Sequence, residues 1–136
     1  MKNALVRTAL VVFALCVGAW LVVAYRAIEL EEKGQAAVTD LQHGRISAAK
    51  QRDAVDALDD ARFLNADQAP NLIEGNLWVF ASDRRRAAAL ARKITADEPE
   101  NVSGWFLAYL VETGAAKRAA IRRVSELDPW AGEALR

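Results

Sequence analysis

Few side chains in this sequence could carry out chemistry, and they do not gather into a catalytic motif. His43 is the only histidine, and it stands beside Gly44. An imidazole can act as a base or a metal ligand, but at a glycine-flanked helix end it is more often a solvated cap. The sequence contains no Gly-rich phosphate loop, nucleophile elbow or histidine-bearing metal motif. We therefore predict no enzymatic activity, no catalytic residue, no metal site and no cofactor.

Four aspartates form the strongest candidate for a cation site. Residues three and four positions apart share one face of a helix, which could bring several carboxylates together. These aspartates, however, are interleaved with basic residues and lie opposite an apolar stripe. The aspartates are Asp53, Asp56, Asp59 and Asp60, the bases are Lys50, Arg52 and Arg62, and the stripe is Ala54, Ala57, Leu58 and Ala61. The pattern favours a solvated, mixed-charge helix face over a metal site.

A run of three arginines is the second group with possible chemistry. Arg84, Arg85 and Arg86 open a predicted helix that Ser82 and Asp83 precede as caps. Cations at a helix N-terminus oppose the macrodipole by a few tenths of a kcal/mol each, roughly. An acidic partner, an anionic lipid or an anionic envelope polymer would compensate for this, and so would plain solvation. These three residues are the anion-binding candidates.

The longest uncharged stretch of the chain is residues 8–25. At about 1.5 Å per residue it reaches roughly 27 Å, nearly the thickness of a bilayer core. It extends back to Ala4 with one interruption, Arg7, whose side chain can snorkel to the headgroups. Trp20 and Tyr25 lie near the other end, where amphipathic rings favour the interface. We predict that residues 1–26 form a membrane anchor that contacts the bilayer through residues 5–25, with Cys16 as a small apolar residue within it.

The charges on either side of the apolar segment predict its orientation. Lys2 and Arg7 precede it, whereas Arg26 and an acid-rich stretch follow it. The positive-inside rule then places the N-terminus in the cytoplasm and the rest of the chain outside. The alternative is a signal peptide cleaved after Ala24, which would make the protein secreted. The length of the apolar run favours a retained, single-pass anchor.

The remainder of the chain has the size of one small domain. Two of the 18 basic residues, Lys2 and Arg7, precede residue 26, whereas all 18 acidic residues follow it, so residues 26–136 carry a formal charge of −2. This balance argues against nucleic-acid binding. The domain has no cysteine, which excludes disulfides and thiolate metal sites and leaves its stability to packing.

That packing has a period of 30 residues. The similar segments are ARFLNAD at 61–67, ARKITAD at 91–97 and IRRVSEL at 121–127, and Pro70, Pro99 and Pro129 follow them. Each belongs to a stretch with helical apolar spacing, and the second and third stripes are Ala87, Leu90, Ala91 and Ile94, then Ala120, Ile121, Val124 and Leu127. Aromatic-rich segments at 72–81 and 102–111 lie between them. Recurring helix pairs predict stacked supersecondary units.

Residues 27–43 are expected to continue as a helix from the membrane and to provide the partner of the first repeat helix, with His43-Gly44 as the break. Residues 44–136 would then form the repeats. No segment has the alternation typical of a strand.

This pattern resembles the tetratricopeptide repeat family over roughly residues 44–136. The family places a small, a bulkier and an apolar residue at set distances before a terminal proline, and the matching residues are Ala87, Ala91 and Ile94, then Lys117, Ile121 and Val124, and, with one residue inserted, Ala57, Ala61 and Leu64. Trp105 stands where the family often has its tryptophan. The period is shorter than the usual value of about 34, and Lys117 departs from the small-residue preference. The resemblance implies an all-α fold: a single transmembrane helix followed by a short α-solenoid of antiparallel helix pairs.

In that family the first helices of the repeats line a groove that binds peptides or partner helices. By analogy, Glu74, Leu77, Trp78, Phe106 and Leu110 are the partner-binding candidates, although a small array must also use aromatic side chains in its core. We predict a membrane-anchored, non-enzymatic scaffold or adaptor that tethers a protein partner, another membrane or envelope protein, at the extracytoplasmic face. Accessory subunits of envelope machineries resemble it. The alternative is an anchored or secreted module that binds anionic polymer or lipid through its arginines. The oligomeric state stays open.

Overall fold

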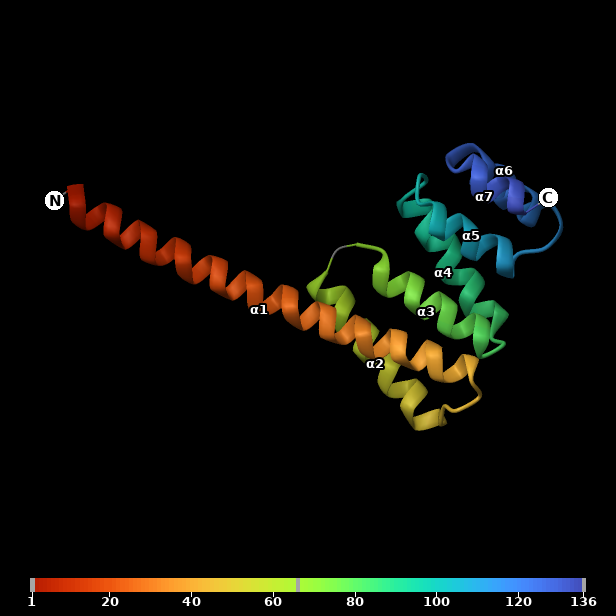
Figure 1. Ribbon diagram of the computed structural model, residues 1–136, viewed down its shortest axis with the longest axis horizontal. Coiled ribbons are helices and arrows are strands. Elements are labelled where there is room, and N and C mark those ends of the chain that lie inside the picture. The colour runs from red at the N-terminus through yellow and green to blue at the C-terminus, as the bar shows by residue number, and fades with distance from the viewer. Residues whose placement is uncertain (1, 66, 136) are drawn as a thin grey trace.

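The computed structural model describes residues 2–65 and 67–135, and side chains from Val6 onward. The described residues contain helices and no strand, which confirms the all-helical class. In chain order the helices are α1 (Lys2–Gln42), α2 (Ala48–Leu64), α3 (Ala69–Phe80), α4 (Arg84–Asp97), α5 (Val102–Val111), α6 (Gly114–Leu127) and α7 (Pro129–Ala134). The N-terminal half of α1 projects away from all the other helices (Figure 1).

The long helix α1 has two halves with different surroundings. Every side chain from Val6 to Val23 is exposed, whereas Ala27, Leu30, Ala37 and Val38 are buried by the rest of the protein. The first half is long and apolar enough to cross a membrane, as the sequence predicts. The helix then continues without a break, so the apolar segment is joined rigidly to the folded domain.

Helix α2 runs back along α1 after a short turn. The turn contains His43, which lies exposed at the end of α1 with its Nδ1 2.7 Å from the carbonyl oxygen of Thr39, and Gly44, whose φ of +65° favours glycine. Lys50, near the start of α2, pairs with Asp40, and the Nδ2 of Asn65, just after α2, donates to Glu31 Oε1 at 3.1 Å. Contacts near both ends therefore fix α2 against α1.

Close approach of α2 to α1 depends on Gly34. A Cβ atom at this position would lie 2.6 Å from Cδ2 of Leu58, a side chain with no exposed surface. Because carbon atoms make contact at about 3.5–4.0 Å, any larger residue at position 34 would push Leu58 away.

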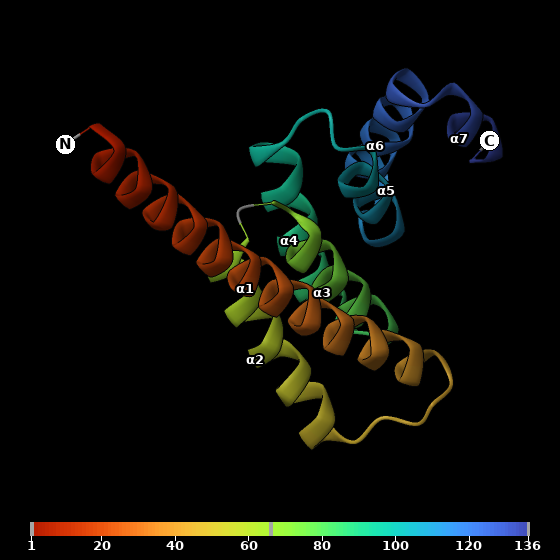
Figure 2. The ribbon, with the colours of Figure 1, turned by 60° about the vertical axis from the view of Figure 1, so that its left-hand side comes forward.

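The later helices continue the packing away from the anchor. Helix α3 contacts both α1 and α2, α5 contacts both α3 and α4, and α7 covers α6. Helices α1 to α3 therefore form one end of the folded part and α5 to α7 the other (Figures 1 and 2). Side-chain caps start α4 and α5, where Asp83 accepts from the backbone N–H of Arg86 and Asn101 from that of Gly104.

The apolar stripes predicted from the sequence face the core. Most of their members are buried, and Leu58, Ile94 and Val124 have no exposed surface. Leu90, Ile121 and Leu127 are half-buried at the edges of the stripes. On the opposite side of α2, Asp53, Asp56, Asp59 and Asp60 are exposed, as predicted.

Candidate partner-binding surfaces

An open, uncharged surface of the domain lies between α3 and α5. A groove of about 410 Å³ is lined there by Leu72 and Asn76 on α3 and by Val102, Ser103, Phe106 and Leu107 on α5. We call it the α3–α5 groove. Its lining holds no charged side chain, and its two polar members, Asn76 and Ser103, are small. Such a surface suits an apolar partner segment that offers one or two hydrogen bonds.

Two of the sequence-predicted partner-binding residues are exposed at or beside this groove. Phe106 lines it and is 41% exposed, and Leu110, one turn further along α5, is 42% exposed. The Phe106 ring packs beside Tyr109, with 5.8 Å between ring centroids. Tyr109 is in turn covered by the Lys117 ammonium, 4.5 Å from its ring centroid. Neighbouring side chains therefore hold the Phe106 ring in place while one side stays open.

The expectation that Leu77 and Trp78 face a groove is wrong for Leu77 and largely so for Trp78. Leu77 has no exposed surface because it packs in a cluster with Ala37, Val38 and Ala54. Trp78 is 8% exposed because it belongs to the core cluster of α3, α4 and α5. Helix α3 is covered by α1, α2, α4 and α5, so little of its surface is left for a partner.

Glu74 is also unavailable, because it belongs to a polar network that links α2 to α3. It pairs with Arg62 and accepts a hydrogen bond of 2.6 Å from the indole Nε1 of Trp78. Arg62 also donates to Asn71 Oδ1 at 2.7 Å, and Asn71 donates to Gln68 Oε1 at 2.6 Å. Buried polar groups need such partners, so we assign Glu74 a structural role.

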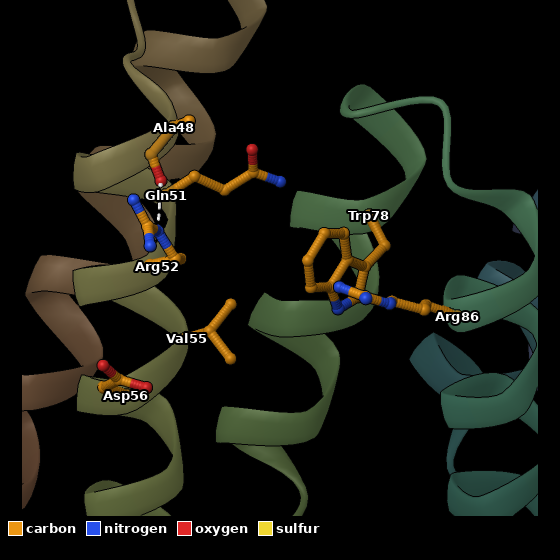
Figure 3. A pocket seen from close by; sticks show the side chains of 7 residues that line it. All are labelled: Ala48, Gln51, Arg52, Val55, Asp56, Trp78 and Arg86. Atoms are coloured by element: carbon orange, nitrogen blue, oxygen red, sulfur yellow. Dashed lines mark hydrogen bonds between the residues drawn. The ribbon is translucent and has the colours of Figure 1, made fainter.

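A second hollow of about 300 Å³ lies between α2, α3 and α4, with Trp78 at its edge (Figure 3). Gln51 and Val55 point into it from α2, and the guanidinium of Arg86 lies across the indole with Cζ 4.3 Å from the ring centroid (Figure 3). Arg52 is turned back along α2 to the carbonyl oxygen of Ala48. The two arginines of this hollow, Arg52 and Arg86, therefore already have intramolecular partners.

The three arginines predicted to bind anions have three different roles. Arg84 donates to the carbonyl oxygens of Val111 and Glu112 and so caps the C-terminus of α5, where a cation is favourable. Arg86 stacks on Trp78 and pairs with Asp83, with 3.4 Å between Nε and Oδ2. Arg85 is exposed and has no acidic partner among the described residues. The expected cluster of three free guanidinium groups is therefore reduced to one.

No three His, Cys, Asp or Glu side chains of the described residues are placed to hold a metal ion. The pKa of Glu29 is lowered by hydrogen bonds from Lys33 and Arg26, and that of Asp40 by a hydrogen bond from Lys50. Both carboxyl groups belong to surface ion pairs at α1, away from the grooves described above.

The sequence analysis missed Leu72 and Asn76, the two α3 residues of the α3–α5 groove. The 30-residue period contains the signal, because Leu72 corresponds to Val102 and Asn76 corresponds to Phe106. Leu77 corresponds instead to Leu107, which is 2% exposed. The position one period before the exposed Phe106 is therefore Asn76 and not Leu77.

Comparisons with protein-family models, with curated proteins and with solved structures find no match to this chain.

Proposed function

We propose that the protein is a membrane-anchored, non-enzymatic helical scaffold that tethers a protein partner through the α3–α5 groove. The observation that carries this proposal is the partial exposure of Phe106 and Leu110 at an uncharged groove. Aromatic side chains held in place at a surface are favoured binding hot spots, because little rotamer freedom is lost when they bind. The partner is a membrane or envelope protein with an apolar segment.

The order of contacts supports a short solenoid of antiparallel helix pairs, as the tetratricopeptide resemblance implies. The pairs would be α1 with α2, α3 with α4 and α5 with α6, and α7 would close the last one. In each later pair the first helix contacts both helices of the preceding pair. The α3–α5 groove then lies between first helices, the surface with which that family binds its ligands.

Tethering at a membrane gives such a scaffold a mechanism that needs no chemistry. Because α1 joins the apolar segment directly to the domain, the groove is confined to a shell near the bilayer. Confinement raises the effective concentration of the groove for any partner in the same membrane. The charge bias around the apolar segment favours a domain on the extracytoplasmic side.

The side of the membrane is tested with a single cysteine at Ala89, an exposed position of α4. In a Cys16→Ser background, Ala89→Cys should react with an impermeant thiol reagent in intact cells. Reaction only after permeabilisation would place the domain in the cytoplasm.

Partner binding is tested by photocrosslinking in native membranes. We place a photoreactive phenylalanine analogue at Phe106 and, as the matched control, at Ala89, which is exposed on a different helix. A protein partner of the groove gives a crosslinked species from position 106 only, and Leu110→Ser in the same chain should remove it. Identical products from both positions, or none from position 106, would contradict the proposal.

The salt dependence of the crosslink separates this proposal from anion binding through the arginines. Contacts at an uncharged apolar groove are little affected by ionic strength, whereas polymer binding through cations weakens steeply with salt. We expect the crosslink to survive high salt and the Arg85→Ala substitution. The engagement of Arg84 and Arg86 within the protein weighs against the anion-binding alternative.

A further inference from the structure

The end of α2 lies beside the last turns of the apolar segment of α1. A notch of about 390 Å³ separates them, with Leu64, Asn65 and Asp67 on one side and Trp20, Val23 and Ile28 among the α1 residues on the other. The hydrogen bond from Asn65 to Glu31 fixes this arrangement. The C-terminal end of α2 is therefore the part of the folded domain that lies beside the apolar half of α1 (Figure 1).

This arrangement limits how far α1 can enter the hydrocarbon. Asp67 is exposed and lines the notch together with Val23 and Ala24, although both belong to the uncharged stretch of the sequence. A carboxylate and its polar turn are excluded from the hydrocarbon, so the hydrocarbon must end near Trp20, an interfacial residue type. The segment from Ala4 to Trp20 then spans roughly 25 Å, at the short end of the range for a membrane helix.

The eight residues of α1 that follow Trp20 rise roughly 12 Å, so they pass through the headgroup layer and reach its outer edge. Several exposed side chains on this part of the molecule are large and apolar. Phe63, on the last turn of α2, is 91% exposed, and Tyr25 and Ile28 on α1 are 72% and 56% exposed. None of the three is covered by the core, although Leu64, next to Phe63, packs against buried Leu30 and Ala61. Exposed aromatic side chains at this level have the chemistry of an interfacial belt.

We propose that Phe63, Tyr25 and Ile28 dock the domain onto the headgroup layer of the membrane that α1 crosses. This inference depends on the membrane anchor of the proposed function. The occupant is lipid because Tyr25 and Ile28 belong to the helix that carries the apolar segment, and Phe63 directly precedes Leu64, which lines the notch beside that segment. The docked domain lies against the bilayer, which fixes the height and tilt of the α3–α5 groove above it.

The charges around the notch indicate which lipid surface fits. Glu31 and Asp67 line it, and Arg26, the nearest cation after the apolar segment, is paired with Glu29 at 2.9 Å. An acidic rim does not attract anionic headgroups. Docking therefore uses apolar insertion into a zwitterionic surface and needs no anionic lipid.

The test uses the full chain reconstituted in phosphatidylcholine vesicles, with one environment-sensitive fluorophore at a time. The label is placed on Phe63→Cys or Lys93→Cys, each in a Cys16→Ser background, and on native Cys16 in a third sample. Lys93 is the matched control because it is exposed and stands 30 residues after Phe63, at the equivalent position of the next similar segment. The two quenchers are iodide in the water and a lipid that carries a nitroxide near the top of its acyl chains.

We expect the label at position 63 to emit at shorter wavelength, to be quenched by the nitroxide lipid and to be protected from iodide. The label at position 93 should show the opposite pattern, and adding phosphatidylglycerol should not strengthen the contact at position 63. A protein occupant would leave position 63 open to iodide, because these vesicles contain no other protein. If iodide reaches position 63 while the label on Cys16 stays protected, the docking is overturned and the anchor is retained. If iodide also reaches Cys16, both the docking and the membrane anchor are overturned. Contact at position 63 only with phosphatidylglycerol would overturn the apolar mode.

Discussion

Residues 6–23 and residues 27–42 belong to the same helix, yet their side chains have different surroundings. In the first stretch every side chain is exposed, including Leu10, Phe13 and Leu15. In the second, a face with Ala27, Gly34 and Ala37 is covered by the domain. Both stretches are uninterrupted helix, so backbone propensity does not separate them.

Part of the difference lies in side-chain size, because small residues alternate with Leu30 and Val38 on the covered face. Small residues let another helix approach closely, as Gly34 does for Leu58, whereas large exposed apolar residues need an apolar solvent. The second stretch therefore packs on protein, and the first, which is long and apolar enough to cross a membrane, suits contact with lipid. Substitutions in the folded domain should change its stability, and matched substitutions in residues 6–23 should not.

The largest effect is expected for Ile94→Ala. Ile94 has no exposed surface and lies in the core cluster of α3, α4 and α5, so the truncation should cost roughly 2–5 kcal/mol. Leu15→Ala, which removes a side chain that is 68% exposed, should leave the domain unchanged. Thermal unfolding of the full chain in detergent, followed by circular dichroism, measures both. A loss with Leu15→Ala as large as that with Ile94→Ala would mean that the apolar segment packs on protein.

The two glycines of α1 give a sharper comparison within one helix. Gly34→Ala introduces a methyl group 2.6 Å from a buried leucine side chain, and such overpacking should destabilise the domain by about 1–3 kcal/mol. Gly18→Ala meets no atom within 4 Å and should have no effect on domain unfolding. Chemical denaturation of both variants in the same detergent checks this. Equal unfolding midpoints for the two would show that α2 is not seated on α1 as described.

Adjacent arginines should differ in a smaller way. Arg84→Ala removes the cation that caps α5 and should cost about 1–2 kcal/mol. Arg85→Ala removes an exposed side chain and should change the free energy of unfolding by less than about 0.5 kcal/mol. The same denaturation assay measures both free energies of unfolding. Equal values for the two variants would contradict the assignment of Arg84 as a cap of α5.

The smallest effect is a pH-dependent one at the turn between α1 and α2. Hydrogen bonding to Lys50 lowers the pKa of Asp40 below its ordinary value of 3.8, so the ionised form is favoured in the folded state. The stabilisation is present above that value and is lost as the pH falls through the lower pKa of the folded protein. Asp40→Asn should therefore lower the melting temperature slightly at neutral pH and have no effect in strong acid. A difference that grows on acidification would have the wrong sign.

The sequence predicted the helices well because their signals are local. The aromatic-rich segments at 72–81 and 102–111 became α3 (Ala69–Phe80) and α5 (Val102–Val111), and the apolar spacing identified buried residues such as Ala57 and Ile94. Both kinds of prediction use signals within a few residues of the helix concerned: the apolar periodicity of the segment or a neighbouring proline. The apolar segment was predicted from length and composition, the same two properties by which the first half of α1 is able to cross a membrane.

The candidate surface was predicted less well because it depends on contacts between distant helices. Helix α3 has apolar side chains on several sides, and only the positions of α1 and α2 explain why Leu77 is buried. From the sequence, Arg84 is an unfavourable cation at the N-terminus of α4. In the structure it donates to the carbonyl oxygen of Val111 at the end of α5, 27 residues later in the chain. The pairing of Glu74 with Arg62 likewise joins two helices. No local pattern contains these partners.

If one helix both crosses the membrane and packs in the domain, residues 6–23 must remain covalently attached to the rest of the chain and remain in the membrane. The measurement is the intact mass of the protein recovered from membranes washed with alkaline carbonate. We expect the protein in the membrane pellet with a mass that includes residues 1–24. A species that begins at Tyr25 and appears in the soluble fraction would contradict the account, because the apolar half of α1 would then be a cleaved signal.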